Sequence, residues 1–182
     1  MGKIVSNFFI TLDGVVEAPE SWQHPFFDDE MGAVVGAGLE TNRAFLMGRR
    51  VYDEWVVAWP DSTDEPMATY FNNVAKYVIS SSLADPEWNN TTVLPGDVDA
   101  VRELKDSIDG DIGMSGSATT VRWLLAHELL DELHLLVHPI TAGHGQRLFE
   151  ATPTRRFELI DSAILSTGVL NLSYAPTRRG AA

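Results

Sequence analysis

The spacing of apolar positions changes repeatedly along the chain between that of a strand and that of a helix. Residues 3–10 are rich in β-branched and aromatic side chains and predict a buried strand. Residues 28–40 carry apolar side chains at helical spacing behind an acidic start, and predict a helix. Residues 11–27 between them contain one glycine and two prolines. A loop of this length in a compact domain is usually functional, so we expect it to line a site.

The same alternation continues toward the C-terminal part of the chain. Further strands are predicted at 44–47, 76–79, 92–94, 111–114 and 131–138. Further helices are predicted at 50–58, 67–73, 98–108 and about 117–127. Residues 157–165 and 169–174 predict a hairpin around Ser166-Thr167-Gly168, and 176–182 a frayed tail. Strands that alternate with helices and then run antiparallel predict one α/β domain with an antiparallel edge.

Length and charge narrow the classes of function. The 182 residues fit a single domain, with a core over about 3–175. Lys and Arg number 13 against 26 Asp and Glu, a net charge of −13, so neither nucleic acid nor a membrane surface is an expected partner. No apolar run reaches the roughly 18 residues of a membrane span, and the N-terminus does not resemble a signal peptide. We therefore expect a cytoplasmic protein that acts on a small molecule.

Three predicted strands end in polar or glycine-rich segments, at 47–50, 79–82 and 114–119. In open α/β sheets, ligands bind beyond the carboxyl ends of the strands. Two of these segments lead into helix N-termini, whose free N–H groups and dipole favour phosphate. Gly48 and Gly116 allow a ligand to approach the backbone closely. Each feature alone is usually an ordinary turn or a solvated arginine, but the three together favour a phosphate site.

The motifs of other common sites are missing. The chain has neither the glycine pattern of standard dinucleotide-binding folds nor that of phosphate-binding loops. The absence of cysteine excludes disulfides, thiolate metal sites and cysteine nucleophiles. His134, His138 and His144 lack the close convergence with a carboxylate that a metal needs, so no metal is expected. Ser117 replaces the last glycine of a hydrolase nucleophile elbow, which argues against a hydrolase.

The segment Phe45-Leu46-Met47-Gly48-Arg49-Arg50-Val51-Tyr52 resembles the strand–Gly-Arg–helix segment of dihydrofolate reductases and of the riboflavin-pathway reductase domain, the RibD C-terminal family. Thr11-Leu12-Asp13-Gly14 resembles the Ser-Leu-Asp-Gly loop of the second group. Gly116-Ser117, residues 129–133 and residues 138–149 resemble its later motifs. Order and spacing agree from about residue 3 to residue 174.

This resemblance implies a dihydrofolate-reductase-like three-layer fold, with a mixed, mostly parallel central sheet, helices on both faces and an antiparallel C-terminal hairpin. It also implies NADPH as cofactor and hydride transfer to a pterin, a pyrimidine or a similar ring. By motif match, the residues that contact the cofactor would be Gly48, Arg49 and Arg50 at its phosphates, Ser80 and Ser81 at its 2′-phosphate, and Gly116, Ser117, Ala118 and Thr119 at its pyrophosphate. Val51 stands where the family usually has a threonine, so one hydroxyl contact to the cofactor is lost.

The substrate side of the site is expected between residues 11–27 and the helix after them. Trp22, Pro25 and Asp28 resemble the Trp-x-x-Pro-acid segment of dihydrofolate reductases, with the acid one residue later. Asp28 either orients ring N–H groups and relays a proton or caps the helix. Asp13 is a second candidate catalytic carboxylate, with an ordinary turn as the alternative. The aromatic side chains of Trp22, Phe26 and Phe27 either stack on a flat substrate or belong to the core.

Two functions from different classes remain open. One is a reductase of a small heterocyclic compound, which the long aromatic loop favours because it indicates a second ligand beside the cofactor. The other is a protein that binds a nucleotide or another small ligand on the same fold without turnover, which Val51 favours. The resemblance further implies a homodimer, because such domains often pair.

Overall fold

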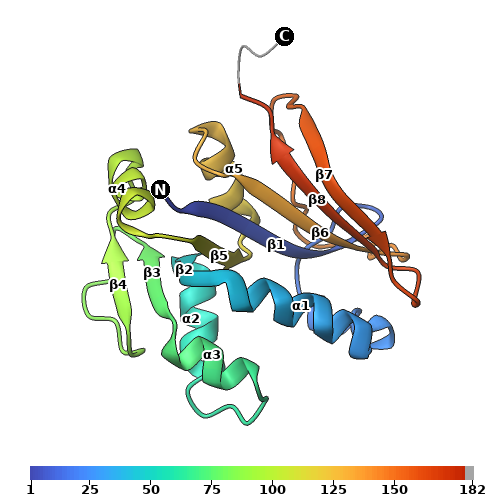
Figure 1. Cartoon of the computed structure of the whole chain (residues 1–182), viewed down its shortest axis with the longest axis horizontal. Coiled ribbons are helices and arrows are strands. Elements are labelled where there is room, and N and C mark those ends of the chain that lie inside the picture. The colour runs from blue at the N-terminus through green and yellow to red at the C-terminus, as the bar shows by residue number, and fades with distance from the viewer. Residues whose placement is uncertain (179–182) are drawn as a thin grey trace.

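The computed structural model describes residues 1–178 and contains an eight-stranded sheet in the order β4-β3-β2-β5-β1-β6-β8-β7 (Figure 1). The strands are β1 (Lys3–Thr11), β2 (Asn42–Gly48), β3 (Ala75–Ile79), β4 (Thr91–Leu94), β5 (Asp111–Ser115), β6 (Glu132–His138), β7 (Phe157–Ile164) and β8 (Leu170–Pro176). The helices are α1 (Asp29–Thr41), α2 (Arg49–Ala58), α3 (Met67–Asn73), α4 (Val98–Ser107) and α5 (Ala118–Ala126), with short 3-10 turns at Pro19–Ser21 and His24–Phe26.

The pairing confirms the mixed, mostly parallel sheet. β1 lies between β5 and β6, and every pair from β4 to β6 is parallel. β8 pairs antiparallel with both β6 and β7. Helices connect the parallel strands except β3 and β4, which residues 80–90 join without a helix, whereas β7 and β8 need only a tight turn.

Helices cover both faces of the sheet (Figure 1). α4 and α5 pack on one face, where Val101 and Leu124 join Ile4 and Ile112 of the strands in one buried cluster. On the other face, α2 and α3 pack against β2 and β3, and α1 packs through Met31 on β6 and the β7–β8 hairpin. This arrangement is the α/β architecture that the sequence predicts.

Local sequence explains where three of the helices begin. Asp28 caps α1, Asp97 caps α4 and Ser117 caps α5, and each side chain accepts a hydrogen bond from a backbone N–H of the first turn. Within residues 1–178, no helix has the length and apolar character needed to cross a bilayer.

Most predicted elements are present with bounds shifted by one or two residues. The predicted tail is wrong at its start, since Pro176 is the last residue of β8 and lies opposite Phe157. A proline is tolerated there because the end of a strand requires no ladder hydrogen bond from it. The rest of the predicted tail, 179–182, lies outside the described residues.

Candidate functional site

The predicted cofactor residues lie at one edge of the sheet. β2, β3 and β5 are adjacent and parallel, so their carboxyl ends meet at the same edge. Gly48 is the last residue of β2, and α2 begins directly after it. α5 begins three residues after Ser115, the last residue of β5. Ligands bind at this edge in open α/β sheets.

Gly48 lies so close to the start of α5 that a side chain at this position would displace the Thr120 hydroxyl. A Cβ atom at Gly48 would lie 2.5 Å from Oγ1 of Thr120 and 3.7 Å from Oγ of Ser117. These two hydroxyl oxygens are 3.0 Å apart. Gly116 has a φ of +67°, a conformation that favours glycine, and its peptide bond to Ser117 is cis. We call this glycine-lined group of Gly48, Gly116, Ser117 and Thr120 the cradle.

The N-terminus of α2 opens at the cradle without a side-chain cap. Its N-cap residue is Gly48, and its first turn contains no acidic residue. The N–H groups of the first helical turn have no partner within their own helix, and the helix dipole favours an anion beside them. A phosphate group therefore fits this position.

The two arginines after Gly48 point to different neighbours. Arg49 donates from Nε to Asp53 at 2.7 Å and lies with Nη1 3.5 Å from Oγ of Ser82. Arg50 pairs with Glu54 at 3.1 Å and with Glu17 of the long loop at 3.4 Å. Arg49 thus lies beside the 79–82 segment, whereas Arg50 contacts the loop over residues 11–27.

The serines after β3 have different roles. The Ser80 hydroxyl accepts hydrogen bonds from the backbone N–H groups of Ser82 and Leu83, both at 3.1 Å, so it shapes the turn. Ser81 is exposed. Ser82, which the sequence did not single out, is the serine in contact with Arg49. The hydroxyl group in contact with Arg49 is therefore that of Ser82, and Ser81 is exposed next to it in the chain.

Ala118 and Thr119 differ in what they can offer a ligand. Ala118 is 1% exposed and its methyl group belongs to the core, so only its backbone can contact a cofactor. Thr119 is exposed, and its hydroxyl lies 3.4 Å from both Nε2 of Gln146 and Nη2 of Arg122.

Asp13 is fully engaged by its own surroundings. Its carboxylate accepts hydrogen bonds from the Thr11 hydroxyl at 2.5 Å and from the N–H groups of Ala142 and Gly143 at 3.1 and 2.8 Å. The Thr11 and Gly143 hydrogen bonds are the main reasons why the pKa of Asp13 falls to about 2. Through these contacts Asp13 ties the long loop to residues 139–148, beyond the local turn that its position before Gly14 suggests.

Asp28 is the N-cap of α1. One carboxylate oxygen accepts from the backbone N–H of Met31 at 2.9 Å, and the other accepts from the Ser166 hydroxyl in the β7–β8 turn at 3.1 Å. The hydrogen bond from Met31 holds the pKa of Asp28 below its ordinary value. The carboxylate is thus ionised near neutral pH and both its oxygens have protein partners.

The aromatic residues of the long loop gather around a buried histidine. Trp22, Phe26 and Phe9 contact the His138 ring edge-on, with ring centroids 5.1, 5.5 and 5.7 Å away. Phe27 remains 43% exposed, 6.4 Å from the Phe9 ring. Pro25 is exposed. Trp22 and Phe26 therefore contribute to packing under the loop, while Phe27 is open to a ligand.

His138 is fully buried, and burial lowers its pKa, so the ring is neutral near pH 7. Nδ1 lies 2.8 Å from the carbonyl oxygen of Leu136, which fixes the proton on Nδ1. Nε2 has no hydrogen-bond partner among the described residues. From the sequence, His138 is considered only as a metal ligand, and that role is rejected. The spacing of apolar residues does not predict the aromatic rings around it, because they come from separate segments of the chain.

Glu17 is a second residue that sequence reasoning missed. It accepts a hydrogen bond from the backbone N–H of Gln146 at 2.8 Å and pairs with Arg50. Both contacts join segments that are far apart in the chain. Within residues 1–178, no group of three or more potential ligands is placed to hold a metal ion.

Comparison with known proteins gives the family of the chain. Residues 2–171 match the model of the RibD C-terminal domain. The chain belongs to this family.

This RibD C-terminal domain protein is similar to one curated protein and to two solved structures. The uncharacterized protein YyaP of Bacillus subtilis (strain 168) is 26% identical, over 94% of each chain. A protein of Shewanella sp. PV-4 assigned to riboflavin biosynthesis has a TM-score of 0.75 at 19% identity, covering 97% of this chain and 99% of its own. The dihydrofolate reductase of Enterococcus faecalis, solved with NADP(H) and RAB-propyl, has a TM-score of 0.66 at 13% identity, covering 97% and 98%. These structures confirm the dihydrofolate-reductase-like fold.

Proposed function

We propose that this protein is an NADPH-dependent reductase that transfers a hydride to a small heterocyclic, pterin- or pyrimidine-like substrate. The observation that carries the proposal is the cradle, where bare glycine backbone and two hydroxyl groups adjoin the uncapped N-terminus of α2. Membership of a reductase family and the dihydrofolate-reductase-like fold support it.

The residues at this edge fit the phosphates of the cofactor. The first turn of α2 and the Gly116–Thr119 backbone would hold the pyrophosphate, with the Ser117 hydroxyl beside it. Arg49, Ser81 and Ser82 would hold the 2′-phosphate, because a guanidinium next to hydroxyl donors suits a dianion. NADPH, when bound, supplies the hydride.

On the substrate side, Asp28 would orient the substrate and not donate a proton. A carboxylate whose pKa is lowered stays ionised, so it accepts hydrogen bonds from ring N–H groups but carries no proton to transfer. Phe27, the exposed member of the aromatic group, would contact the flat face of the ring.

The cofactor assignment is tested by titrating the tryptophan fluorescence with NADPH and, separately, with NADH. We expect Arg49→Ala to weaken NADPH binding by about tenfold or more and to leave NADH binding nearly unchanged, because only NADPH carries the 2′-phosphate. The control is Arg102→Ala, which removes an equal charge from α4. Equal affinities of the wild type for the two nucleotides would exclude a 2′-phosphate site at Arg49.

A second candidate function is binding without turnover. Val51 favours it, since this side chain is 8% exposed, packs in the core and gives the cofactor no hydroxyl group. Oxidation of NADPH in the presence of a panel of pterins and aminopyrimidines separates the two candidates. Turnover of any member establishes a reductase, whereas tight NADPH binding with no oxidation across the panel favours the binding protein.

A further inference from the structure

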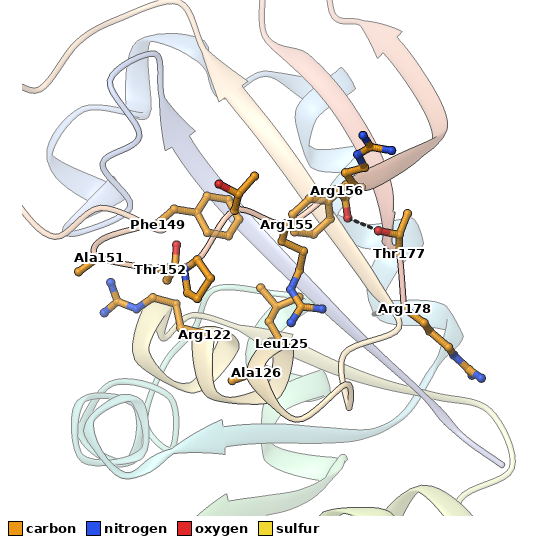
Figure 2. Close-up of a pocket in the computed structure, with 13 residues that line it drawn as sticks. Arg122, Leu125, Ala126, Phe149, Ala151, Thr152, Arg155, Arg156, Thr177 and Arg178 are labelled. Atoms are coloured by element: carbon orange, nitrogen blue, oxygen red, sulfur yellow. Dashed lines mark hydrogen bonds between the residues drawn. The ribbon is translucent and has the colours of Figure 1, made fainter. Parts of the chain in front are cut away.

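A separate cavity lies on the α5 face of the molecule, between α5 and the segments that flank the β7–β8 hairpin (Figure 2). Its volume is about 820 Å³, within the range of small-molecule sites. The apolar part of its wall comes from Leu125 of α5 and from Phe149 and Phe157, whose ring centroids are 5.9 Å apart. The cavity and the aromatic group under α1 lie on opposite faces of the sheet.

Arginines dominate the polar part of this wall. Four of the 13 basic residues of the chain line the cavity, namely Arg122, Arg155, Arg156 and Arg178. Such clustering is unexpected in a chain with a net charge of −13 unless the arginines serve a common purpose.

Within residues 1–178, one of the four arginines is paired with a carboxylate and three are not. Arg122 lies 3.6 Å from Glu150, but Arg155, Arg156 and Arg178 form no ion pair with any residue in the range 1–178. Glu128 and Asp131 line a smaller adjoining hollow of about 160 Å³, where Asp131 is already paired with Lys105.

Two of the guanidinium groups are well placed to meet a ligand. Arg122 is only 19% exposed and is held between Glu150 and the Thr119 hydroxyl, 3.4 Å away. Figure 2 shows the Arg155 side chain extending toward Leu125, so that its charge lies over the apolar wall. The backbone carbonyl of Arg156 accepts hydrogen bonds from the Thr177 hydroxyl and N–H at 2.9 and 3.0 Å, which joins the two chain segments behind the cavity.

We propose that this cavity binds a small aromatic anion, a molecule with a flat apolar body and one phosphate, sulfonate or carboxylate group. The body would pack against Phe149, Phe157 and Leu125, and the anion would accept charge-assisted hydrogen bonds from Arg155 and Arg122. This cavity is separate from the proposed substrate site, but Arg122 also contacts Thr119 of the segment proposed to hold the cofactor, so its test uses no nucleotide.

The probe is anilinonaphthalene sulfonate, an aromatic anion whose fluorescence rises on binding, compared with the neutral N-phenylnaphthylamine. We expect one saturable sulfonate site per chain and a loss of affinity of about tenfold in Arg155→Gln, the effect of one charge-assisted hydrogen bond. Arg155→Lys should retain most of the affinity, and Phe149→Ala should weaken binding. Arg102→Gln on α4 is the matched control and should bind like the wild type. Phenyl phosphate should displace the probe at lower concentrations than inorganic phosphate does.

Circular dichroism checks that each variant is folded. If Arg155→Gln does not fold, Arg155→Lys shows whether a positive charge at this position is enough for binding. Equal affinity for the neutral probe, or an unchanged affinity in Arg155→Gln and Phe149→Ala, would overturn the proposal. It would also fail if sedimentation showed a dimer and the sulfonate had no saturable site, because a second copy of the chain would then cover the cavity. If inorganic phosphate displaced the probe as readily as phenyl phosphate does, the proposed contact of an aromatic ring with the apolar wall would be contradicted.

Discussion

At the scale of single residues, Lys76 is a buried charge that makes stability depend on pH. It is fully buried in β3, and its ammonium group donates to the carbonyl oxygens of Phe71 and Val74 at 2.7 and 2.9 Å. The same nitrogen lies 4.5 Å from the centre of the Trp88 ring. Hydrogen bonds and a ring replace its hydration shell only in part, so burial lowers the pKa of Lys76 to about 8.

Replacement of Lys76 by Met should remove a pH dependence of stability. The pKa of the folded state lies below the ordinary value of 10.5, so the unfolded chain binds the proton more tightly. The free energy of unfolding of the wild type, relative to Lys76→Met, should rise by about 3 kcal/mol from pH 8 to pH 10.5, and stay at its low value below pH 8. Urea unfolding of both proteins across this range measures the difference, in which other titrating groups cancel. If the free energies of unfolding of the two proteins changed in parallel with pH, Lys76 would have to be hydrated in the folded protein.

At the scale of elements, hydrogen bonds connect the N-terminus of α1 to the β7–β8 turn. Asp28 caps the helix and also accepts a hydrogen bond from the Ser166 hydroxyl, and Glu30 accepts one from the Ser166 N–H at 2.7 Å. The helix that follows the long loop is therefore held in place by the β7–β8 turn. A change at Asp28 can alter either the placement of α1 or the proposed contact with substrate.

Asp28→Asn separates these two roles, because asparagine is as good an N-cap as aspartate but has no charge. We expect the variant to unfold at nearly the same urea concentration as the wild type and to lose about tenfold or more in kcat/KM with a substrate found in the turnover screen. Ser166→Ala is the control, since it removes the contact with the hairpin but leaves the carboxylate. If Asp28→Asn kept full activity, Asp28 would be a helix cap alone.

The helices and strands could be predicted from the sequence where the local spacing of apolar residues determines their bounds. The bounds of α3 agree with the predicted helix at 67–73, and the cradle follows from glycines at the ends of neighbouring parallel strands. The hydrogen bonds of Glu17 with Gln146 and of Asp13 with Gly143 were not predictable, because they join residues 129 and 130 positions apart and depend on how the long loop meets residues 139–148. Ser80 was assigned a ligand role by motif match, which does not reveal that its hydroxyl is used within its own turn.

At the scale of the whole molecule, acidic residues outnumber basic ones by two to one, and the basic ones are unevenly distributed. Arg49 and Arg50 stand at the start of α2, and four further arginines line the cavity beside α5. The remaining surface is therefore more acidic than the average charge of the chain indicates. Mutual repulsion of its carboxylates destabilises the compact state, while the arginine groups locally attract anions.

This distribution predicts that salt stabilises the fold and weakens its anion sites. Added NaCl screens the long-range repulsion, so the midpoint of thermal unfolding should rise by several degrees between low and moderate salt, at about 3 °C for each kcal/mol gained. The affinity for NADPH should fall over the same range, because the arginines beside the cradle are exposed and equally screened. Calorimetry and fluorescence titration measure the two effects, with sucrose of equal osmolality as the control for solvent exclusion. If the unfolding midpoint were independent of salt, the carboxylates would have to be paired locally, and repulsion across the molecule would not limit its stability.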